Sequence, residues 1–185
     1  MKINVGCGWE CRPGWLNVDN TEKWQKVNYP ITYMNAIKPW PYEDNKFTAV
    51  LSEHMVEHIP REQNKLFFSE AYRTLKPGKT ARITCPDRKF FENLTDNSHP
   101  FVINYCREIL SNAIPNAERV RTRTLKDQGH VWIPTEDMLI EAMEEAGFKN
   151  VRRVEYGKSD VRIFNGLEKK NGIREYETLC VEGTK

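Results

Sequence analysis

A short apolar segment that runs directly into two glycines at the start of the chain limits the fold most strongly. It covers residues 3–8 (INVGCG), and a second strand-like segment, residues 15–18, leads into Asp19. Glycines after a strand let the backbone approach a ligand, because no Cβ stands in the way. An acid at the end of the second strand can accept hydrogen bonds from ribose hydroxyls. The pattern is typical of an α/β sheet that binds a nucleoside-bearing cofactor, although a tight strand-to-turn junction would select the same glycines.

The rest of the hydrophobic pattern alternates between short strand-like segments and longer helical ones. This alternation is typical of a parallel sheet with crossover helices. One helix is expected after Pro60, with apolar residues on one face, ending at residues 76–78. A second helix is expected from the N-cap Thr135 to Gly147. The predicted strands cover residues 3–5, 15–18, 31–34, 47–51, 80–84, 151–156 and 176–181.

The length of the chain and its irregular middle predict one domain with an insertion. A chain of 185 residues can bury one substantial core but is short for two ordinary domains. Between residues 88 and 129 the periodicity loosens, so we expect a substrate-side insertion there within a single domain over 1–185. The segment 157–173, between the last two strands, is long enough to be a loop with functional freedom.

The charge balance and the cysteine content limit the classes of binding partner and the cellular compartment that we expect. Lys and Arg total 28 against 26 for Asp and Glu, so no large net field indicates a nucleic acid or a membrane surface. The five cysteines are odd in number and include no C-x-x-C pair, which argues against a disulfide framework or a structural zinc site. No leader-like or bilayer-length apolar segment is visible. We expect a soluble, cytoplasmic protein, whose oligomeric state the sequence leaves open.

The candidate ligand-contacting residues follow three of the predicted strands. Ligands of open parallel sheets bind at the carboxyl ends of the strands. The glycine segment 6–8, Asp19 and the segment 52–54 (SEH) are therefore expected to face one ligand.

The segment 54–58 (HMVEH) also matches the H-x-x-E-H pattern of zinc peptidases. In those proteins two histidines on one helical face bind the metal and a glutamate activates water. The context argues against this interpretation, since His54 lies at a strand end and Pro60 breaks a helix through the motif. We therefore expect no metal, and a zinc hydrolase built on His54, Glu57 and His58 is the less favoured alternative.

Taken in order, these segments resemble the class I S-adenosylmethionine-dependent methyltransferases, within the compact methyltransferase type 11-like group. The resemblance rests on residues 4–8, 14–19, 40–47, 53–58, 72–78, 83–87, 139–148 and 174–185. It implies a Rossmann-like α/β fold with a seven-stranded, mostly parallel sheet and an antiparallel C-terminal hairpin. It also implies S-adenosyl-L-methionine as the cofactor. Only residues 9–18 separate Gly8 from Asp19, so the first crossover helix is expected to be short or missing.

The resemblance further implies which residues contact the cofactor. The glycine segment would contact the methionine part, Asp19 the ribose, Asn35 the adenine edge, and the segment 52–54 the methyl-bearing side. The implied cofactor-binding residues are Gly6, Cys7, Gly8, Asp19, Asn20, Asn35, Ala36, Ser52, Glu53 and His54. Asn4 and Asn35 stand where the family often has an acid, so a charge-based hold is weakened at both places.

The cofactor's methyl group is already activated, so the expected task is to align a nucleophile and, where needed, remove a proton. His54 is the first candidate for the base and His130 the second, the alternative for each being a hydrogen-bonded histidine at a loop corner. Trp132, Arg121 and Arg123 are candidates for contacts with the acceptor. The alternatives are a core aromatic for Trp132 and a solvated basic surface for the arginines.

The acceptor is expected to be a small or sugar-like molecule methylated on oxygen or nitrogen. No N/D-P-P-Y/F signature follows the fourth strand, and Cys85-Pro86 reverses the order of a Pro-Cys nucleophile, so nucleic-acid bases are disfavoured. A non-catalytic S-adenosylmethionine-binding module is the alternative. Such a module would keep Gly6, Gly8 and Asp19 without an aligned base.

Overall fold

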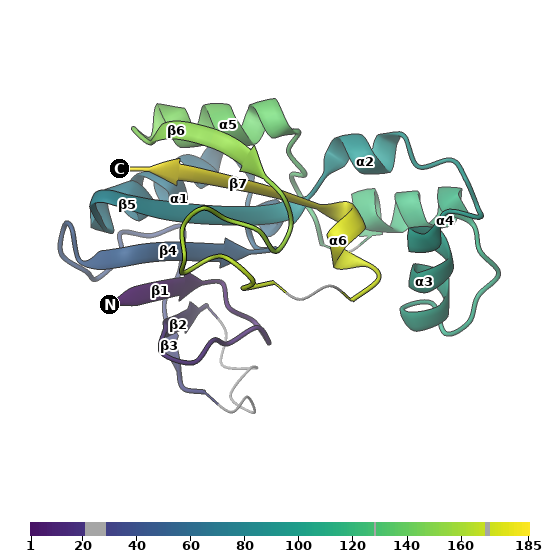
Figure 1. The fold of residues 1–185 in the computed structure, drawn as a ribbon, viewed down its shortest axis with the longest axis horizontal. Helices are drawn as coiled ribbons and strands as arrows, with labels where there is room; N and C mark the ends of the chain where they lie inside the picture. The colour runs from purple at the N-terminus through teal and green to yellow at the C-terminus, as the bar shows by residue number, and fades with distance from the viewer. Residues whose placement is uncertain (21–28, 128, 169–170) are drawn as a thin grey trace.

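The strands of the chain form one mixed sheet (Figure 1). The computed structural model describes residues 1–20, 29–127, 129–168 and 171–185. Within these ranges the sheet has seven strands in the order β3-β2-β1-β4-β5-β7-β6. The strands are β1 (Lys2–Val5), β2 (Leu16–Asp19), β3 (Ile31–Tyr33), β4 (Phe47–Glu53), β5 (Leu75–Pro86), β6 (Lys149–Val154) and β7 (Thr178–Thr184). Strands β1 to β5 pair in parallel and β7 runs antiparallel to β5 and β6, which confirms the predicted Rossmann-like sheet.

The helices fall into a group that packs on the sheet and a group at one end of it (Figure 1). Helices α1 (Arg61–Thr74) and α5 (Glu136–Glu145) pack on one face. A 3-10 turn, η2 (Val56–His58), precedes α1, and α6 (Arg174–Glu177) precedes β7. Helices α2 (Arg88–Glu92), α3 (Pro100–Glu108) and α4 (Ala117–Thr122), with the π-helical turn η3 (Arg123–Asp127), form the insertion. None of the helices in the described ranges is both long and apolar enough to span a membrane.

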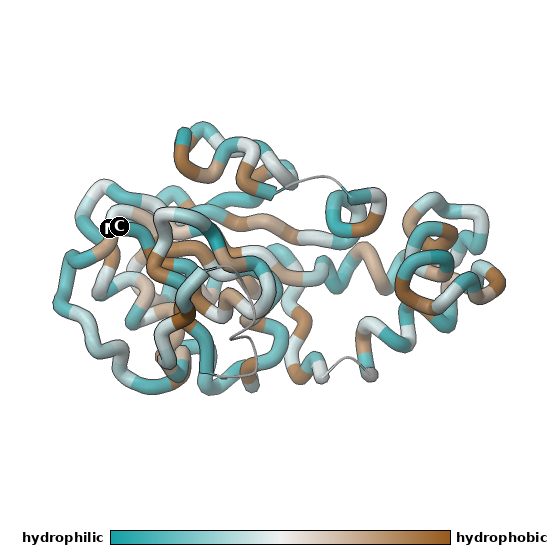
Figure 2. Tube along the Cα trace, turned by 90° about the horizontal axis from the view of Figure 1, so that it is seen from below, coloured by the Kyte–Doolittle hydropathy of each residue, from teal (hydrophilic) through white to brown (hydrophobic). Residues whose placement is uncertain are grey.

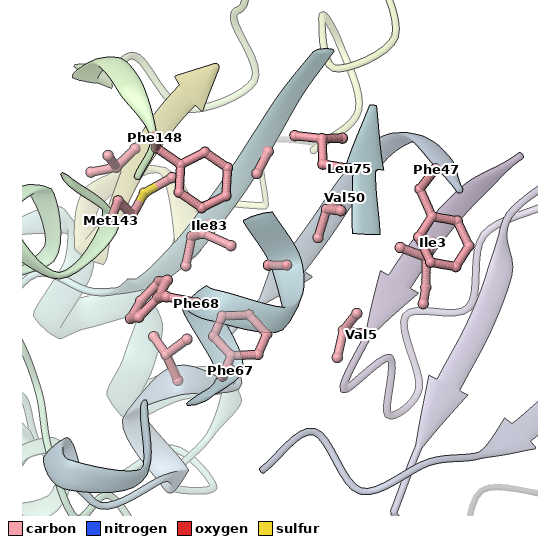
Figure 3. Close-up of a cluster of buried hydrophobic side chains, with 14 of the residues drawn as sticks. Ile3, Val5, Phe47, Val50, Phe67, Phe68, Leu75, Ile83, Met143 and Phe148 are labelled. Carbon is pink, nitrogen blue, oxygen red and sulfur yellow. The ribbon is translucent and has the colours of Figure 1, made fainter. Parts of the chain in front are cut away.

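The main core lies between the sheet and helices α1 and α5 (Figure 3). Val50 of β4 and Ile83 of β5 pack in one cluster with Phe67 and Phe68 of α1 and with Met143 of α5, and all five are almost fully buried. The two phenylalanines lie on the face of α1 that the helical spacing of the sequence predicted.

Several element boundaries differ from the sequence prediction, among them those of β5, β6, β7 and the end of α1. Strand β5 begins at Leu75 rather than at residue 80, because Leu75 pairs with Phe47 of β4. The last strand begins at Thr178, since the four residues before it form α6 instead.

The connection between β1 and β2 contains no helix, as the short spacing predicted. Two buried asparagines from the strands hold this loop. Nδ2 of Asn4 donates to the carbonyl of Glu10 at 2.9 Å and to Oδ1 of Asn17 at 3.1 Å. The same Oδ1 accepts from the backbone N–H of Arg12 at 2.9 Å. Side-chain amides therefore satisfy loop groups that would otherwise lack a partner.

The segment between β6 and β7 covers part of the other face of the sheet, crossing in front of β4 in Figure 1. Phe164 is fully buried against Ala49 and Leu51 of β4 and against Trp15. The ring centroids of Trp15 and Phe164 are 6.2 Å apart. Part of the segment is therefore anchored on the sheet through Phe164, while residues 158, 160, 162, 165 and 166 are exposed, and its functional freedom stays a prediction.

A buried ion-pair network fixes the same segment to the sheet. Arg82 of β5 is fully buried, and its guanidinium donates to Glu168 at 2.6 Å and to Glu182 of β7 at 2.7 Å. Because both carboxylates are also buried, the network compensates its own charges.

The insertion forms a small helical lobe beyond the carboxyl ends of β4 and β5, set apart from the sheet in Figure 2. It has its own apolar core, made of Phe91, Leu94, Phe101, Val102, Tyr105, Cys106, Ala117 and Val120. Ile173, just before α6, joins this core. The sequence did not predict these helices, because they are short and carry little periodicity. That this lobe is a substrate-side insertion stays a prediction.

Candidate functional site

A cavity of about 510 Å³ opens at the carboxyl ends of β1, β2 and β4. Its size lies in the range of roughly 300 to 1,000 Å³ that is usual for small-molecule sites. The wall consists of Gly6, Gly8, Trp9, Asp19, Asn20, Met34, Asn35, Ala36, Ile37, His54, Met55, His58, Ile59 and Pro60. The structure thus brings together most of the residues that the sequence assigned to the cofactor: Gly6, Gly8, Asp19, Asn20, Asn35, Ala36 and His54.

Three residues assigned to the cofactor do not line this cavity. The thiol of Cys7 is buried, with its Sγ 3.6 Å from Sγ of Cys11, so only the backbone of Cys7 is near the ligand space. Ser52 is fully buried within β4. The carboxylate of Glu53 forms an ion pair with the guanidinium of Arg12 and so holds the β1–β2 loop.

The two glycines of the loop are needed for different reasons. Both have positive φ, 67° at Gly6 and 46° at Gly8, a region that glycine enters without steric cost. A Cβ at Gly6 would collide with Cγ of Met55, whereas a Cβ at Gly8 would meet nothing within 4 Å. The N–H of Gly8 donates to Oδ2 of Asp19 at 2.9 Å. Gly8 therefore leaves an open cradle for a ligand directly beside a carboxylate.

His54 has both ring nitrogens engaged. Nη1 of Arg174 lies 2.8 Å from its Nδ1, and Oγ1 of Thr178 lies 2.9 Å from its Nε2. Burial, together with the charge of Arg174, lowers the pKa of His54 to about 3. Because a guanidinium only donates, Nδ1 accepts and the neutral ring carries its hydrogen on Nε2. His54 is therefore a weak base at neutral pH.

Glu57 lies in η2, directly after His54, Met55 and Val56. Its side chain is fully buried, and among the residues that the structure describes neither carboxylate oxygen has a hydrogen-bond partner. Nδ1 of the neutral His54 ring lies 3.3 Å from Oε1 of Glu57. Burial raises the pKa of Glu57. Its backbone carbonyl accepts from the N–H groups of Val131 at 2.8 Å and Trp132 at 3.1 Å, which brings the segment 129–132 alongside η2.

That pairing places His130 next to His58, with their ring centroids 4.9 Å apart. Nδ1 of His58 lies 3.2 Å from the carbonyl oxygen of Gly129, and Nδ1 of His130 lies 2.7 Å from that of Thr124. Since a carbonyl only accepts, both Nδ1 atoms carry the hydrogen and both Nε2 atoms keep a lone pair. Burial lowers the pKa of His130, which favours the neutral ring.

The three residues suggested for the acceptor do not reach this cavity. Trp132 lines a groove between α1 and α5. Arg121 of α4 forms an ion pair with Glu118, and Arg123 is exposed in η3. A run of basic residues in the sequence does not reveal which way each side chain points on a short helix. The charge pattern therefore did not predict where these two arginines lie relative to the cavity.

Sequence reasoning missed part of the wall and one of its supports. Trp9, which is 64% exposed, lies at the cavity, and only its position after Gly8 could have suggested it. Met55 packs under Gly6 without any motif of its own. Arg174 contacts His54 from the far end of the chain, a proximity that only the fold creates.

Comparison with known proteins gives a match in sequence and several in structure. Residues 4–83 match a family model described as a methyltransferase domain. No curated protein sequence matches the chain.

Solved structures of S-adenosylmethionine-dependent methyltransferases share the fold. One from Archaeoglobus fulgidus has a TM-score of 0.64 at 17% identity, over 100% of this chain and 85% of the other. One from Thermotoga maritima has a TM-score of 0.61 at 16% identity, over 100% of this chain and 82% of the other. One from Mesorhizobium loti has a TM-score of 0.57 at 18% identity, over 100% of this chain and 90% of the other.

The segment that matches the family contains the glycine loop, Asp19 and the end of β4, which together form most of the cavity wall. These structural matches extend over the whole chain. Residues 4–83 therefore match a methyltransferase domain, and the chain has the fold of the solved S-adenosylmethionine-dependent methyltransferases.

Proposed function

We propose that this enzyme transfers the methyl group of S-adenosylmethionine to an oxygen or nitrogen of a small or sugar-like acceptor. The proposal rests on one observation. The open space at Gly8 and the carboxylate of Asp19, which is hydrogen-bonded to the N–H of Gly8, lie in the same cavity as His54 and His58. The five free thiols fit the reducing cytoplasm in which we place the protein.

The residues present in the cavity fit the cofactor. The open space at Gly8 admits the methionine part against the backbone. Oδ2 of Asp19 is held by the N–H of Gly8, which orients Oδ1 to accept from a ribose hydroxyl. Oδ1 of Asn35 accepts from the N–H of Ile37 at 3.0 Å, so its amide nitrogen is the group that would meet the adenine edge.

When bound, S-adenosylmethionine supplies a methyl group that is already activated for transfer. The protein must then orient the acceptor's nucleophile and, for a hydroxyl or a protonated amine, accept a proton. We assign His54 a positioning role, because both of its nitrogens are engaged and its pKa is about 3. We assign proton acceptance to Nε2 of His130, which keeps a lone pair; its ring lies next to that of His58, a residue of the cavity wall.

Calorimetry and a turnover assay test this proposal. We expect one molecule of S-adenosylhomocysteine to bind per chain and turnover to appear with some member of a panel of small hydroxyl and amine acceptors. His130→Ala should lower turnover by about 100- to 10,000-fold while leaving cofactor affinity nearly unchanged. His99→Gln, in the insertion, is the matched histidine control. Failure of the folded protein to bind either S-adenosylmethionine or S-adenosylhomocysteine refutes the proposal.

A further inference from the structure

Three potential metal ligands gather at the edge of the cofactor cavity. The ligand atoms of Glu57, His58 and His130 all lie within 4.8 Å of one another. Glu57 and His58 come from η2, and His130 comes from the segment that pairs with the backbone carbonyl of Glu57. Two imidazole nitrogens with one carboxylate oxygen are a donor set that suits divalent transition metals.

Both histidines are oriented as metal ligands usually are. In metal sites the imidazole nitrogen that does not bind the metal commonly donates to a carbonyl or carboxylate, which fixes the tautomer and the ring orientation. Here Nδ1 of His58 faces the carbonyl of Gly129, and Nδ1 of His130 faces that of Thr124. In both rings the lone pair is thereby left on Nε2.

The carboxylate of Glu57 is an independent indication of a cation. A fully buried carboxylate without hydrogen bonds is costly unless a positive charge compensates it. The nearby cation Arg174 is engaged elsewhere, since its Nη1 donates to Glu177 at 2.9 Å and to His54 at 2.8 Å. A metal ion between Glu57 and the two histidines would supply the missing charge.

We propose that Glu57, His58 and His130 bind one divalent transition-metal ion, of the Zn²⁺ type, at the wall of the cofactor cavity. Three protein ligands leave a coordination position open for another molecule, as in catalytic sites. Because His58 lines the cavity, the open position is accessible to the acceptor.

The function of the ion rests on the proposed methyl transfer. It would bind the acceptor's oxygen or nitrogen and lower the pKa of that group, so that its proton leaves to water. In the metal-bound enzyme both Nε2 atoms are ligands, and the ion takes over the proton-removing role assigned to His130 in the metal-free protein.

This site differs from the zinc-peptidase pattern in the sequence. That pattern would use His54 with Glu57 and His58, but both ring nitrogens of His54 are hydrogen-bonded to other groups. His130, from a distant part of the chain, stands in its place. The expectation that the protein has no metal is therefore replaced by a testable site with a different third ligand.

Titration with Co²⁺ alone, followed by visible absorption, tests the site on the chelator-treated full chain, and Zn²⁺ then competes. We expect one Co²⁺ per chain in the parent protein. His130→Ala and Glu57→Gln should each weaken binding by at least about 100-fold, since even residues that only orient the ligands are worth about 10- to 100-fold. His99→Gln should bind Co²⁺ as the parent does, and His54→Asn, which loses only a contact with Glu57, should be affected less than His130→Ala.

Thermal unfolding shows whether a variant that binds no metal has simply failed to fold. Glu57→Gln removes an uncompensated buried charge, so the metal-free variant should be at least as stable as the metal-free parent but should gain nothing from Zn²⁺. Absence of Co²⁺ binding by the folded parent overturns the inference. Equal binding by the parent and His130→Ala, or loss of binding only in His54→Asn, overturns it as well.

Binding of S-adenosylhomocysteine to the same samples separates this inference from the proposed function. Metal-free protein that binds the nucleoside and turns over without added metal supports the methyltransferase proposal and refutes the metal's role in it. Metal binding without nucleoside binding supports the metal site and refutes the proposed function.

Discussion

Replacing Asp19 by alanine should weaken cofactor binding more than any other single change in the β1–β2 region. The side chain is only 8% exposed, and its Oδ2 accepts the N–H of Gly8 at 2.9 Å. In our proposal Oδ1 accepts from the ribose. The alanine variant loses the ribose contact and releases the N–H that holds the glycine loop against the cavity.

The size of the effect follows from the strength of hydrogen bonds to a charged acceptor. Such bonds contribute about 1.5 to 3 kcal/mol, and roughly 1.4 kcal/mol corresponds to a tenfold change in affinity. We therefore expect the dissociation constant for S-adenosylhomocysteine to rise by roughly ten- to a hundredfold. Calorimetric titration of the parent and the variant measures this directly.

Two control variants separate the ribose contact from the loop contact. Asp19→Asn keeps a carbonyl oxygen for the N–H of Gly8 but loses the charge, so its affinity should lie between those of the parent and the alanine variant. Asn20→Ala changes an exposed neighbour on the cavity wall and should matter less. If Asp19→Ala binds S-adenosylhomocysteine with the parent's affinity, the second strand does not end at the ribose and the reasoning from Asp19 is refuted.

Three further predictions concern the loop, the buried network and acid stability. Gly8→Ala should fold with a small loss of stability, since its Cβ meets no atom within 4 Å and only the left-handed backbone is strained, but it should lose cofactor affinity. Gly6→Ala carries the same strain and also collides with Met55, so it should lower the melting temperature more; calorimetry and thermal unfolding distinguish the two. Glu168→Ala should destabilise the protein by about 3 to 5 kcal/mol in urea unfolding, because it removes both hydrogen bonds that the buried guanidinium of Arg82 donates to this carboxylate. The hydrogen bond from Arg73 lowers the pKa of Glu70 below its ordinary value of 4.5, so the stability that this carboxylate contributes is present above about pH 4.5 and is lost as the pH falls through its folded-state pKa. Thermal unfolding between neutral and acid pH should therefore show the advantage of the parent over Glu70→Gln shrinking below pH 4.5; a constant difference across that range contradicts the assignment.

The parts of the site that lie at strand ends could be predicted from the sequence. Gly6, Asp19 and His54 are far apart in the chain but meet in one cavity, because parallel strands bring their carboxyl ends to the same edge of the sheet. Local chemistry also sufficed for the start of α5, where Oγ1 of Thr135 accepts the N–H of Met138 at 3.4 Å as an N-cap.

The remaining parts depend on contacts that leave no local pattern. Arg12 takes the carboxylate of Glu53 away from the cavity, and the sequence shows no periodicity that links the two. His130 reaches His58 only because the segment after it bonds to the backbone carbonyl of Glu57, and any residue type can make such a bond. The sequence motif therefore groups His54 with Glu57 and His58, whereas the structure places the possible ligand atoms of His130 near those of Glu57 and His58.

The unusual asparagine in β1 and the missing crossover helix are physically linked. A helix after β1 would point the free N–H groups of its first turn toward a ligand, and its other backbone groups would form hydrogen bonds within the helix. In this chain the loop is held by Nδ2 of Asn4, which donates to two acceptors, the carbonyl of Glu10 and Oδ1 of Asn17. A carboxylate at position 4 has no hydrogen to donate and would face two oxygens. An acid therefore cannot occupy position 4 while the loop keeps its present conformation, and in our proposal the loop backbone and Asp19 make the polar contacts with the cofactor on this side.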